Sequence, residues 1–272
     1  MAWPAVVRDP RKHWAPVPAH RLELCRRMPH RRGNTSVSAG GMRCAVTEGG
    51  FCVVTVLRGC PACFPELVWS AVRALVLNCT LKASPEPSNT DRLAGVVVQA
   101  LREREVEVTT LRLADLNIPP GVATDMDAGD DWPRVHEQLL TSQILVVATP
   151  TWVGHPSSIA QRMLERMDAM LSETDADGRP VAYNRVAGVV VTGNEDGAHH
   201  VISEIAGGLM DFGYTIPGQA WTYWNRGPGP GPSYSETEEG HEWSAKTGRA
   251  MAANLHTVAR ALATTPMGPP PP

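Results

Sequence analysis

The chain has 272 residues, of which 43% are hydrophobic and 19% are charged, and its formal net charge is −3 at pH 7. This composition supports a buried core and excludes a chain that is disordered throughout. No apolar run approaches the roughly 18 residues that a membrane-spanning helix needs, so the sequence predicts no such helix and no membrane partner.

Charge and cysteine are distributed unevenly along the chain. Residues 1–70 hold 10 Lys and Arg against 4 Asp and Glu, whereas the remainder holds 15 against 24. Five of the six cysteines also precede residue 70. We therefore predict three parts: an irregular basic extension rich in Cys, Arg and Pro at residues 1–67, a folded domain at residues 68–264, and a disordered Pro-rich tail at residues 265–272.

The extension carries two motifs that allow a functional or a structural interpretation. Cys60-Pro61-Ala62-Cys63 has the spacing of a redox motif, yet Pro65 interrupts the helix that a thioredoxin-type site requires. The basic run at residues 26–32 suits nucleic acid, but short runs of this kind are more often solvated, and we predict no nucleic-acid partner. Because the segment lacks a hydrophobic period and a secretory signal, we expect a disordered extension or a misassigned start, and a cytoplasmic protein.

Regular patterns begin at residue 72. Residues 72–77 form a mostly apolar run, which is typical of a buried parallel strand. Ser88 followed by Asp91 resembles a capping box and starts a predicted helix. Residues 106–113 alternate like a strand near a sheet edge, and a further helix is predicted at residues 132–140.

The second half of the chain continues this alternation. We predict strands at residues 143–148, 186–191 and 215–220, helices that begin at Pro156 and near residue 202, and a closing helix at residues 251–262. Five strands that alternate with helices predict one doubly wound α/β domain around a parallel sheet. Ligands bind such sheets beyond the carboxyl ends of the strands, where the strand order reverses, so the loops after the strands are candidate sites.

The loop at residues 78–90 runs from a strand end into a helix start, where free N–H groups and the helix dipole attract a phosphate. Its hydroxyl, amide and ammonium groups suit a terminal phosphate monoester, and they belong to Thr80, Lys82, Ser88, Asn89 and Thr90. The loop matches neither a Walker A sequence nor the glycine pattern of dinucleotide folds. The alternative is an ordinary Ser N-cap after a turn.

The loop at residues 149–157 holds an aromatic side chain at a strand end. Trp152 stands between Pro150 and Gly154, a position that suits contact with a flat ring. The alternative is a buried Trp that caps the sheet.

The loop at residues 192–200 combines glycines with polar residues. Its two glycines and Asn194 allow backbone amides to face the edge of an electron-rich ring, whereas Asp196 alternatively caps the next helix. His199 and His200 are adjacent on that helix and point in different directions, so we predict no metal site.

Together the three loops resemble those of the flavodoxin-like NAD(P)H-dependent FMN reductase and quinone reductase superfamily. Thr80-Leu81-Lys82…Ser88-Asn89-Thr90 is similar to the phosphate loop of that family, Ser-x-Arg…Ser/Gly-Asn-Thr, with Lys82 where Arg is usual. Pro150-Thr151-Trp152-Val153-Gly154-His155-Pro156-Ser157 matches the stretch that lies along the flavin ring, and residues 192–197 stand where the third flavin loop does. The insertion Ala83–Pro87 and the acidic pair Glu195-Asp196 depart from the family pattern.

The resemblance implies a flavodoxin-like fold, a five-stranded parallel sheet with helices on both faces, that binds FMN. It also implies hydride transfer from NADPH or NADH through flavin N5 to a small acceptor such as a flavin or a quinone. The flavin carries this chemistry, so we predict no catalytic side chain and no metal. The cofactor-binding residues that the resemblance assigns are Thr80, Lys82, Ser88, Asn89, Thr90, Pro150, Thr151, Trp152, Val153, Gly154, Gly193, Asn194, Asp196 and Gly197.

An aromatic cluster follows the last predicted strand and is formed by Trp221, Tyr223 and Trp224. It leads into a Gly/Pro-rich loop at residues 227–232, and we predict that the two cover the flavin and line the substrate pocket. The alternative is a surface patch for subunit contact. We expect a homodimer or homotetramer, because a flavin at a sheet edge often calls for a partner subunit.

Two other functions fit the same architecture. A flavodoxin-type electron carrier without a substrate of its own is the first, and the long aromatic loop argues against it. A domain without flavin, either a regulatory module or an esterase, is the second. Asn78-Cys79-Thr80 supplies no aspartate cluster for a response regulator, and the Gly-x-Ser-x-Gly elbow of a serine hydrolase is absent from the sequence.

Overall fold

The computed structural model describes residues 72–127, 129–227 and 231–271, together with the backbone of short strands between residues 6 and 56. The chain divides into two compact units, residues 1–70 and 71–272. In the first unit, two antiparallel sheets are formed by β1 (Val6–Arg8) with β2 (Trp14–Pro16), and by β3 (Val37–Ala39), β4 (Met42–Val46) and β5 (Cys52–Val56). The basic run at residues 26–32 and the motif at residues 60–63 lie outside the described residues.

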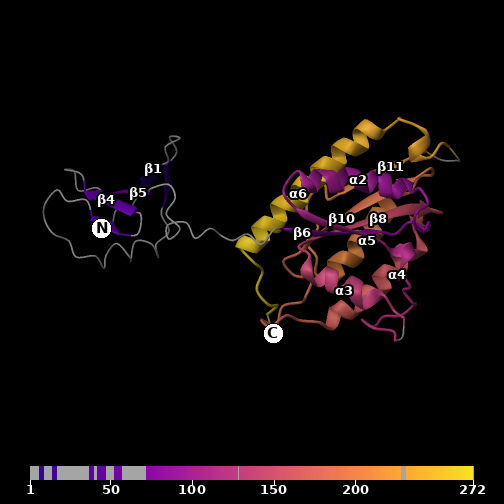
Figure 1. Ribbon diagram of the computed structural model, residues 1–272, viewed down its shortest axis with the longest axis horizontal. Helices are drawn as coiled ribbons and strands as arrows, with labels where there is room; N and C mark the ends of the chain where they lie inside the picture. Colours follow the sequence, from indigo (N-terminus) through magenta and orange to yellow (C-terminus); the bar gives the residue numbers. More distant parts are fainter. Residues whose placement is uncertain are drawn as a thin grey trace. The chain divides into compact units, whose positions relative to one another are not determined.

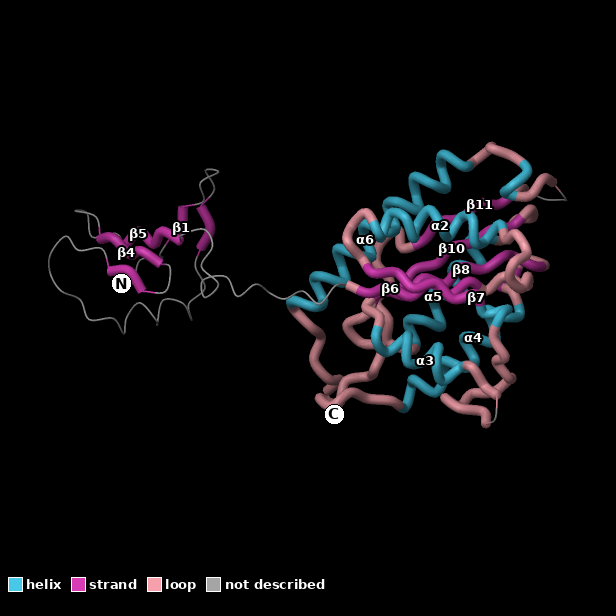
Figure 2. The backbone as a smooth tube through the Cα atoms, in the orientation of Figure 1, coloured by secondary structure: helices cyan, strands magenta, loops and turns pink. Residues whose placement is uncertain are grey.

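The second unit is built on a parallel sheet (Figures 1 and 2). Its strands are β6 (Arg73–Asn78), β7 (Glu107–Arg112), β8 (Ile144–Trp152), β10 (Val186–Gly193) and β11 (Trp221–Asn225), and a short antiparallel β9 (His155–Pro156) pairs with β8. The order across the sheet is β11-β10-β8-β6-β7. Counted along the parallel strands this is 2-1-3-4-5, the flavodoxin-like order, and it confirms the predicted fold class.

Helices cover both faces of the sheet (Figure 1). One face carries α2 (Asn89–Arg102) and α6 (His241–Thr264), and the other carries α3 (Trp132–Thr141), α4 (Ser158–Met167) and α5 (Ala198–Asp211). The strands separate the two cores by strict alternation: Val76 and Val146 face α2 and α6, whereas Leu77 and Val147 face the other layer. Burial on both faces explains why the central strands are apolar runs rather than alternating ones. None of the helices in the described part of the chain combines the length and the apolar character that a bilayer crossing requires.

Four predicted boundaries are wrong. The closing helix α6 begins at His241, ten residues before the predicted start, and β8 extends to Trp152, so the first part of the predicted loop at residues 149–157 belongs to the strand. The last strand does not span residues 215–220: Thr215 forms only an isolated bridge with Val186, and β11 begins at Trp221. Pro217 cannot donate to a sheet ladder, so pairing starts after it, in a stretch rich in Trp, Thr and Tyr. Helix α4 does not begin at Pro156, which belongs to β9; Ser157 caps the helix by accepting a hydrogen bond from the N–H of Ala160 at 3.1 Å.

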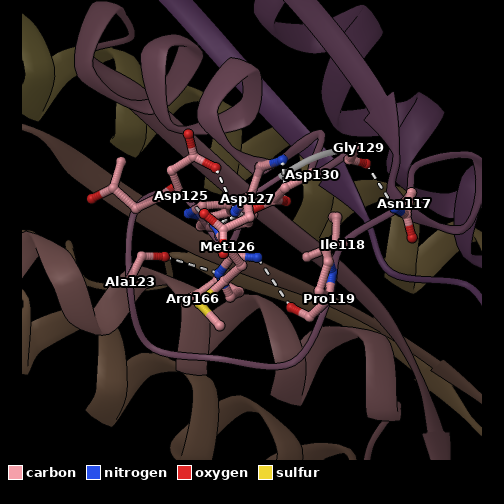
Figure 3. Close-up of polar contacts among 12 residues, drawn as sticks. Asn117, Ile118, Pro119, Ala123, Asp125, Met126, Asp127, Gly129, Asp130 and Arg166 are labelled. Carbon is pink, nitrogen blue, oxygen red and sulfur yellow. Dashed lines mark hydrogen bonds and ion pairs between the residues drawn. The ribbon is translucent and has the colours of Figure 1, made fainter.

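The long connection between β7 and α3 is organised by a buried ion pair (Figure 3). The Arg166 guanidinium on α4 lies 2.6 Å from the Asp130 carboxylate, and both side chains are fully buried. Arg166 also donates to the backbone carbonyls of Ala123 and Pro119, at 3.1 and 3.0 Å. The Arg166 side chain therefore contacts three separate points of the β7–α3 connection, which has almost no secondary structure of its own.

Acidification is expected to weaken this pair. Burial raises the pKa of Asp130, but hydrogen bonds from Arg166 and from the N–H groups of Trp132 and Met126 outweigh it, and the pKa lies below its ordinary value. A lowered pKa in the folded state means that the carboxylate stabilises the fold above the unfolded pKa of about 3.9 and loses that effect as the pH falls through the folded value. We expect urea unfolding to show a steeper loss of stability below about pH 4 in the wild type than in Asp130→Asn. Equal slopes would contradict this prediction.

The second unit contains both helix-covered cores and the whole parallel sheet. We therefore propose that residues 68–264 form the working domain, and we expect a chain of residues 68–272 to keep its melting temperature within about 4 °C of the full chain. Thermal unfolding followed by circular dichroism checks this. Aggregation of the shortened chain would show instead that the first 67 residues contribute to folding.

Candidate functional site

A cavity of about 220 Å³ opens at the carboxyl ends of β6, β8 and β10. The strand order reverses between β6 and β8, so the cavity occupies the switch point where doubly wound folds bind ligands. The predicted site residues that line it are Thr80, Lys82, Ser88, Asn89, Thr90, Pro150, Thr151, Trp152, Gly193, Asn194 and Trp224. Four further lining residues, which the sequence did not single out, are Leu81, Thr192, Ser233 and Tyr234.

Asn78 fixes the first loop at the end of β6. Its buried side chain accepts a hydrogen bond from the N–H of Thr80 at 3.0 Å and donates to the Asp91 carboxylate at 3.1 Å. The first bond is an Asx-type turn, and the second ties the turn to the first turn of α2. The strand end and the helix start are therefore held in a fixed relation before any ligand binds.

The start of α2 presents a group of hydrogen-bond donors to the cavity. Ser88 is the N-cap, and its hydroxyl oxygen accepts from the N–H of Asp91 at 3.2 Å, which leaves its O–H proton free to donate. The N–H groups of Asn89 and Thr90, the first two helical residues, have no acceptor within their own helix. Lys82 adds a positive charge at the same place, and its Nζ donates to the carbonyl of Pro87 at 3.3 Å.

The insertion Ala83–Pro87 is fastened to the neighbouring strand connection. The Asp115 carboxylate accepts from the N–H of Ser84 at 2.6 Å and from its hydroxyl at 2.7 Å. These two bonds hold the pKa of Asp115 below its ordinary value. Arg112 donates to the carbonyl of Glu86 at 2.8 Å. The departure from the family pattern is thus an anchored loop and does not fill the cavity.

The second loop is linked to the first through Ser157. Its hydroxyl donates to the carbonyl of Cys79 at 2.6 Å and lies 3.3 Å from the Thr149 hydroxyl. On the cavity side, the Thr151 hydroxyl is buried and has no hydrogen-bond partner among the described residues. A buried hydroxyl without a partner costs about 1–3 kcal/mol, so this atom is a candidate ligand contact. Trp152 follows it and is 53% exposed.

The third loop approaches the second closely. A Cβ atom on Gly193 would lie 3.0 Å from the Thr151 Cβ, and one on Gly197 would lie 3.0 Å from the Gly154 Cα. A side chain at either position would be tight, and Gly197 also has a φ of +108°, which favours glycine. Thr192, at the end of β10, shares a 2.8 Å hydrogen bond with Thr90. This bond joins the third loop to the start of α2.

An aromatic wall closes the cavity on the side of β11. Trp224 and Tyr234 are buried with ring centroids 5.5 Å apart, and Tyr234 stacks on His241 at 3.9 Å. The Trp224 indole N–H donates to the carbonyl of Glu239 at 2.7 Å, which fixes the ring. The N–H of Ser235 donates to the Asn89 side chain at 3.1 Å, so the segment after the Gly/Pro-rich loop is attached to α2. Residues 228–230 of that loop lie outside the described residues.

Six predicted site residues lie outside the cavity lining: Val153, Gly154, Asp196, Gly197, Trp221 and Tyr223. Side chains alternate along β11, so Trp224 faces the cavity, whereas Trp221 and Tyr223 pack with His199 on the other face of the sheet. Asp196 is exposed and is not the cap of α5, because Gly197 holds the N-cap position.

Val153 and Gly154 form the two-residue turn between β8 and β9, with φ values of +51° and +77°. Positive φ at both positions is typical of a type I′ turn, which favours Asn and Gly and strains a β-branched residue. We expect Val153→Asn to raise the free energy of unfolding by about 1 kcal/mol, since Val153 is 86% exposed and loses few contacts. Gly154→Ala, the matched change at the next position, should lower it by about 1 kcal/mol. Urea unfolding of both variants checks the opposite signs.

Comparison with known proteins identifies the family. The sequence model of NADPH-dependent FMN reductases matches residues 72–224. The 8-demethyl-8-aminoriboflavin-5′-phosphate synthase of Streptomyces davaonensis is 36% identical over 207 residues, which is 72% of this chain and 80% of that protein. The crystal structure of RosB with its bound intermediate OHC-RP (8-demethyl-8-formylriboflavin-5′-phosphate) has a TM-score of 0.68 and 35% identity, over 72% of this chain and 82% of that one.

A further relative is much longer than the matched region. The divalent metal cation transporter MntH of Mycobacterium bovis is 39% identical over 201 residues, or 71% of this chain, but the match spans only 29% of that protein. The family model nevertheless matches more than half of this chain, and the Streptomyces relative is matched over 80% of its length. The chain therefore belongs to the NADPH-dependent FMN reductase family, and it is a flavin-binding protein of the oxidoreductase type.

Proposed function

We propose that this protein is an FMN-dependent oxidoreductase that passes hydride from NADPH or NADH to a small acceptor, such as a flavin or a quinone. One observation carries the proposal: a hydroxyl-rich helix start and an aromatic slot share a single cavity at the switch point of the sheet. This pairing suits a ligand with a phosphate at one end and a flat ring at the other, as FMN is. The family match supports the same ligand.

The phosphate end of the ligand is assigned to the first loop and α2. Lys82 supplies a cation, the hydroxyls of Thr80 and Ser88 supply O–H donors, and Asn89 and Thr90 supply backbone N–H groups. A phosphate dianion is favoured at such a helix start by hydrogen bonding and by the helix dipole. The donor set contains no side-chain carboxylate, which fits an anion.

The ring end is assigned to the second and third loops. The buried hydroxyl of Thr151 has no partner within the described part of the chain, and a heteroatom on a ring edge would satisfy it. Pro150 and Trp152 offer flat apolar surface beside this hydroxyl, while Gly193 leaves no side chain in the way. Tyr234 and Trp224 form the opposite wall and exclude water from that side.

When bound, the flavin would supply the hydride-accepting and hydride-donating centre, so the chain needs to bind, orient and shield it. Cys79 is the one cysteine beside the cavity loops in the described residues, and burial raises the pKa of its thiol well above the ordinary value. The thiol therefore stays protonated and is a poor nucleophile. We assign no side chain as acid or base.

A second candidate function uses the same site with the flavin as substrate. The Streptomyces relative is named for the synthesis of an aminoriboflavin phosphate, and RosB was solved with a formylriboflavin phosphate bound. At 36 and 35% identity these relatives favour a riboflavin-5′-phosphate derivative as the ligand class. A flavin that acts as a resident cofactor would have the same mass after many turnovers. A flavin that acts as a substrate would be released with an altered mass.

Anaerobic titration of the FMN-loaded protein separates these functions. We expect NADPH or NADH to bleach the flavin absorbance and an added quinone or free flavin to restore it over repeated cycles. Mass spectrometry of the flavin before and after cycling should show no change. Altered flavin would favour the second candidate. Reduction without turnover of any small acceptor would favour the flavodoxin-type carrier, and failure to bind FMN would refute the proposal.

We also propose that the protein works as a homodimer or homotetramer. The end of β8 exposes a large apolar side chain, Trp152, at the cavity, and a second subunit would cover it. Light scattering after size-exclusion chromatography checks the mass, and a monomer in the FMN-loaded state would contradict this proposal.

A further inference from the structure

Two histidines and a glutamate converge from two elements outside the cavity lining. His155 stands in β9, and His200 and Glu204 lie on α5. Their candidate ligand atoms all lie within 4.8 Å of one another. We propose that His155, His200 and Glu204 bind a divalent transition-metal ion of the zinc class. This site is separate from the proposed flavin site and does not depend on it.

Backbone geometry brings the three residues together. His200 and Glu204 are four residues apart on one helix and therefore share a face, with His200 Nε2 3.5 Å from Glu204 Oε2. His155 follows the two-residue turn of the β8–β9 hairpin, and its Nδ1 lies 3.4 Å from the same glutamate oxygen. The close packing of Gly154 against Gly197 holds the hairpin against the start of α5.

The two distances to the glutamate are compatible with shared metal ligands as well as with a long hydrogen bond between His155 and Glu204. Both nitrogen-to-oxygen separations exceed the roughly 2.7–3.2 Å of a good N–H···O hydrogen bond. Ligands at about 2.0–2.1 Å from a tetrahedral zinc ion lie about 3.3–3.4 Å from one another, close to the observed values. The two imidazole rings lie edge to face, with centroids 5.0 Å apart and an interplanar angle of 79°.

The donor chemistry selects the class of ion. Two imidazole nitrogens and one carboxylate oxygen form a ligand set that zinc uses with a fourth position open to water. Magnesium and calcium prefer oxygen ligands alone. The side chains of His155 and His200 are 64% and 58% exposed, so an ion can enter from solvent and water can complete its coordination.

His199 is a natural control beside the site. Its ring packs edge-on against Trp221 and Tyr223, at centroid distances of 5.5 and 5.0 Å, and so points away from His155. The two adjacent histidines do point in different directions, as the sequence predicts. The other two proposed ligands beside His200 are Glu204, one turn further along α5, and His155 in β9. An ion at this position would join the hairpin that carries Trp152 to the helix that follows Gly193 and Asn194.

Calorimetric titration with zinc chloride at neutral pH tests the proposal. The full chain is used after alkylation of its accessible thiols, because five cysteines precede residue 70 and thiolates also bind zinc. We expect one equivalent to bind, and His155→Ala or His200→Ala to weaken that binding at least tenfold, roughly the effect of losing even an outer-sphere partner. His199→Ala should stay within about twofold of the wild type, a change below 0.5 kcal/mol.

Cobalt(II) substitution gives an independent readout, since a tetrahedral cobalt site with nitrogen ligands absorbs visible light. We expect this absorption in the wild type and in His199→Ala, and its loss in His200→Ala. Equal melting temperatures of the metal-free proteins exclude misfolding as the cause. The proposal is overturned if the alkylated wild type binds no zinc, if His200→Ala binds it as tightly as the wild type, or if His199→Ala loses it to the same extent.

Discussion

Replacement of Arg166 by methionine is expected to lower the free energy of unfolding by about 3–5 kcal/mol. The substitution keeps most of the side-chain volume but leaves the Asp130 carboxylate, which is fully buried, without its cation. It also removes the donors to the carbonyls of Pro119 and Ala123. Since a domain is stable by about 5–15 kcal/mol, the loss is a large share of the total. Thermal and urea unfolding measure it.

Two variants show whether the buried charge is responsible. Arg162 lies one turn earlier on α4, is exposed, and donates to the carbonyl of Ile118, so Arg162→Met should cost less than about 1 kcal/mol. The double variant Arg166→Met with Asp130→Asn buries no charge and should be more stable than Arg166→Met alone. A double variant as unstable as the sum of its two single changes would show that the pair is not coupled.

The fold was predictable because its central strands are buried on both faces. The apolar runs at residues 72–77, 143–148 and 186–191 correspond to β6, β8 and β10, and the strand order then places their loops at one switch point. The edge strand is harder to predict, because β11 begins only after Pro217 and Gly218 and alternates half-buried with buried positions. The predicted strand at residues 215–220 lies six residues too early and places Trp221 and Tyr223 in a loop. In the structure both residues belong to β11, and the alternation of side chains along the strand points them away from the cavity.

The site was predictable where its residues are local to a strand end. Thr80 to Lys82 and Ser88 to Thr90 belong to the loop that follows β6, and Pro150 to Trp152 form the end of β8. All of them line the cavity. Tyr234 and Ser233 reach it through a contact between Ser235 and Asn89, which are 146 positions apart. Tyr234 begins a short 3₁₀ helix, Tyr234–Glu236, which Ser233 caps, and a helix this short has no period that marks it in advance.

Polar pairs between distant parts of the chain were missed for a related reason. Arg166 on α4 looks like an ordinary charged residue on an exposed face, and its burial depends on a loop that folds over it from residues 117–131. In the same way, His155 and Glu204 are 49 positions apart, and no local pattern connects them. Contacts of this kind follow from the topology and become visible only once the sheet is assembled.

Lys82→Glu is expected to weaken FMN binding about a hundredfold. The change replaces a cation in the cavity lining by an anion beside the proposed phosphate position. Like charges a few ångströms apart interact unfavourably by about 1 kcal/mol per unit charge pair even in water, and the substitution reverses the sign against a dianion. A shift of about 2–3 kcal/mol corresponds to the stated loss of affinity. Quenching of flavin fluorescence on titration measures it.

Four comparisons make this result specific to the phosphate. Lys82 is exposed, so the melting temperature of the flavin-free variant should not change. Lys246→Glu makes the same charge change on α6, outside the cavity lining, and should leave the affinity within about threefold, as screening weakens a distant charge. Lys82→Arg keeps the cation and should keep the affinity. Riboflavin, which lacks the phosphate, should bind the wild type and Lys82→Glu equally; if Lys82→Glu bound FMN as tightly as the wild type, the first loop would not be the phosphate site.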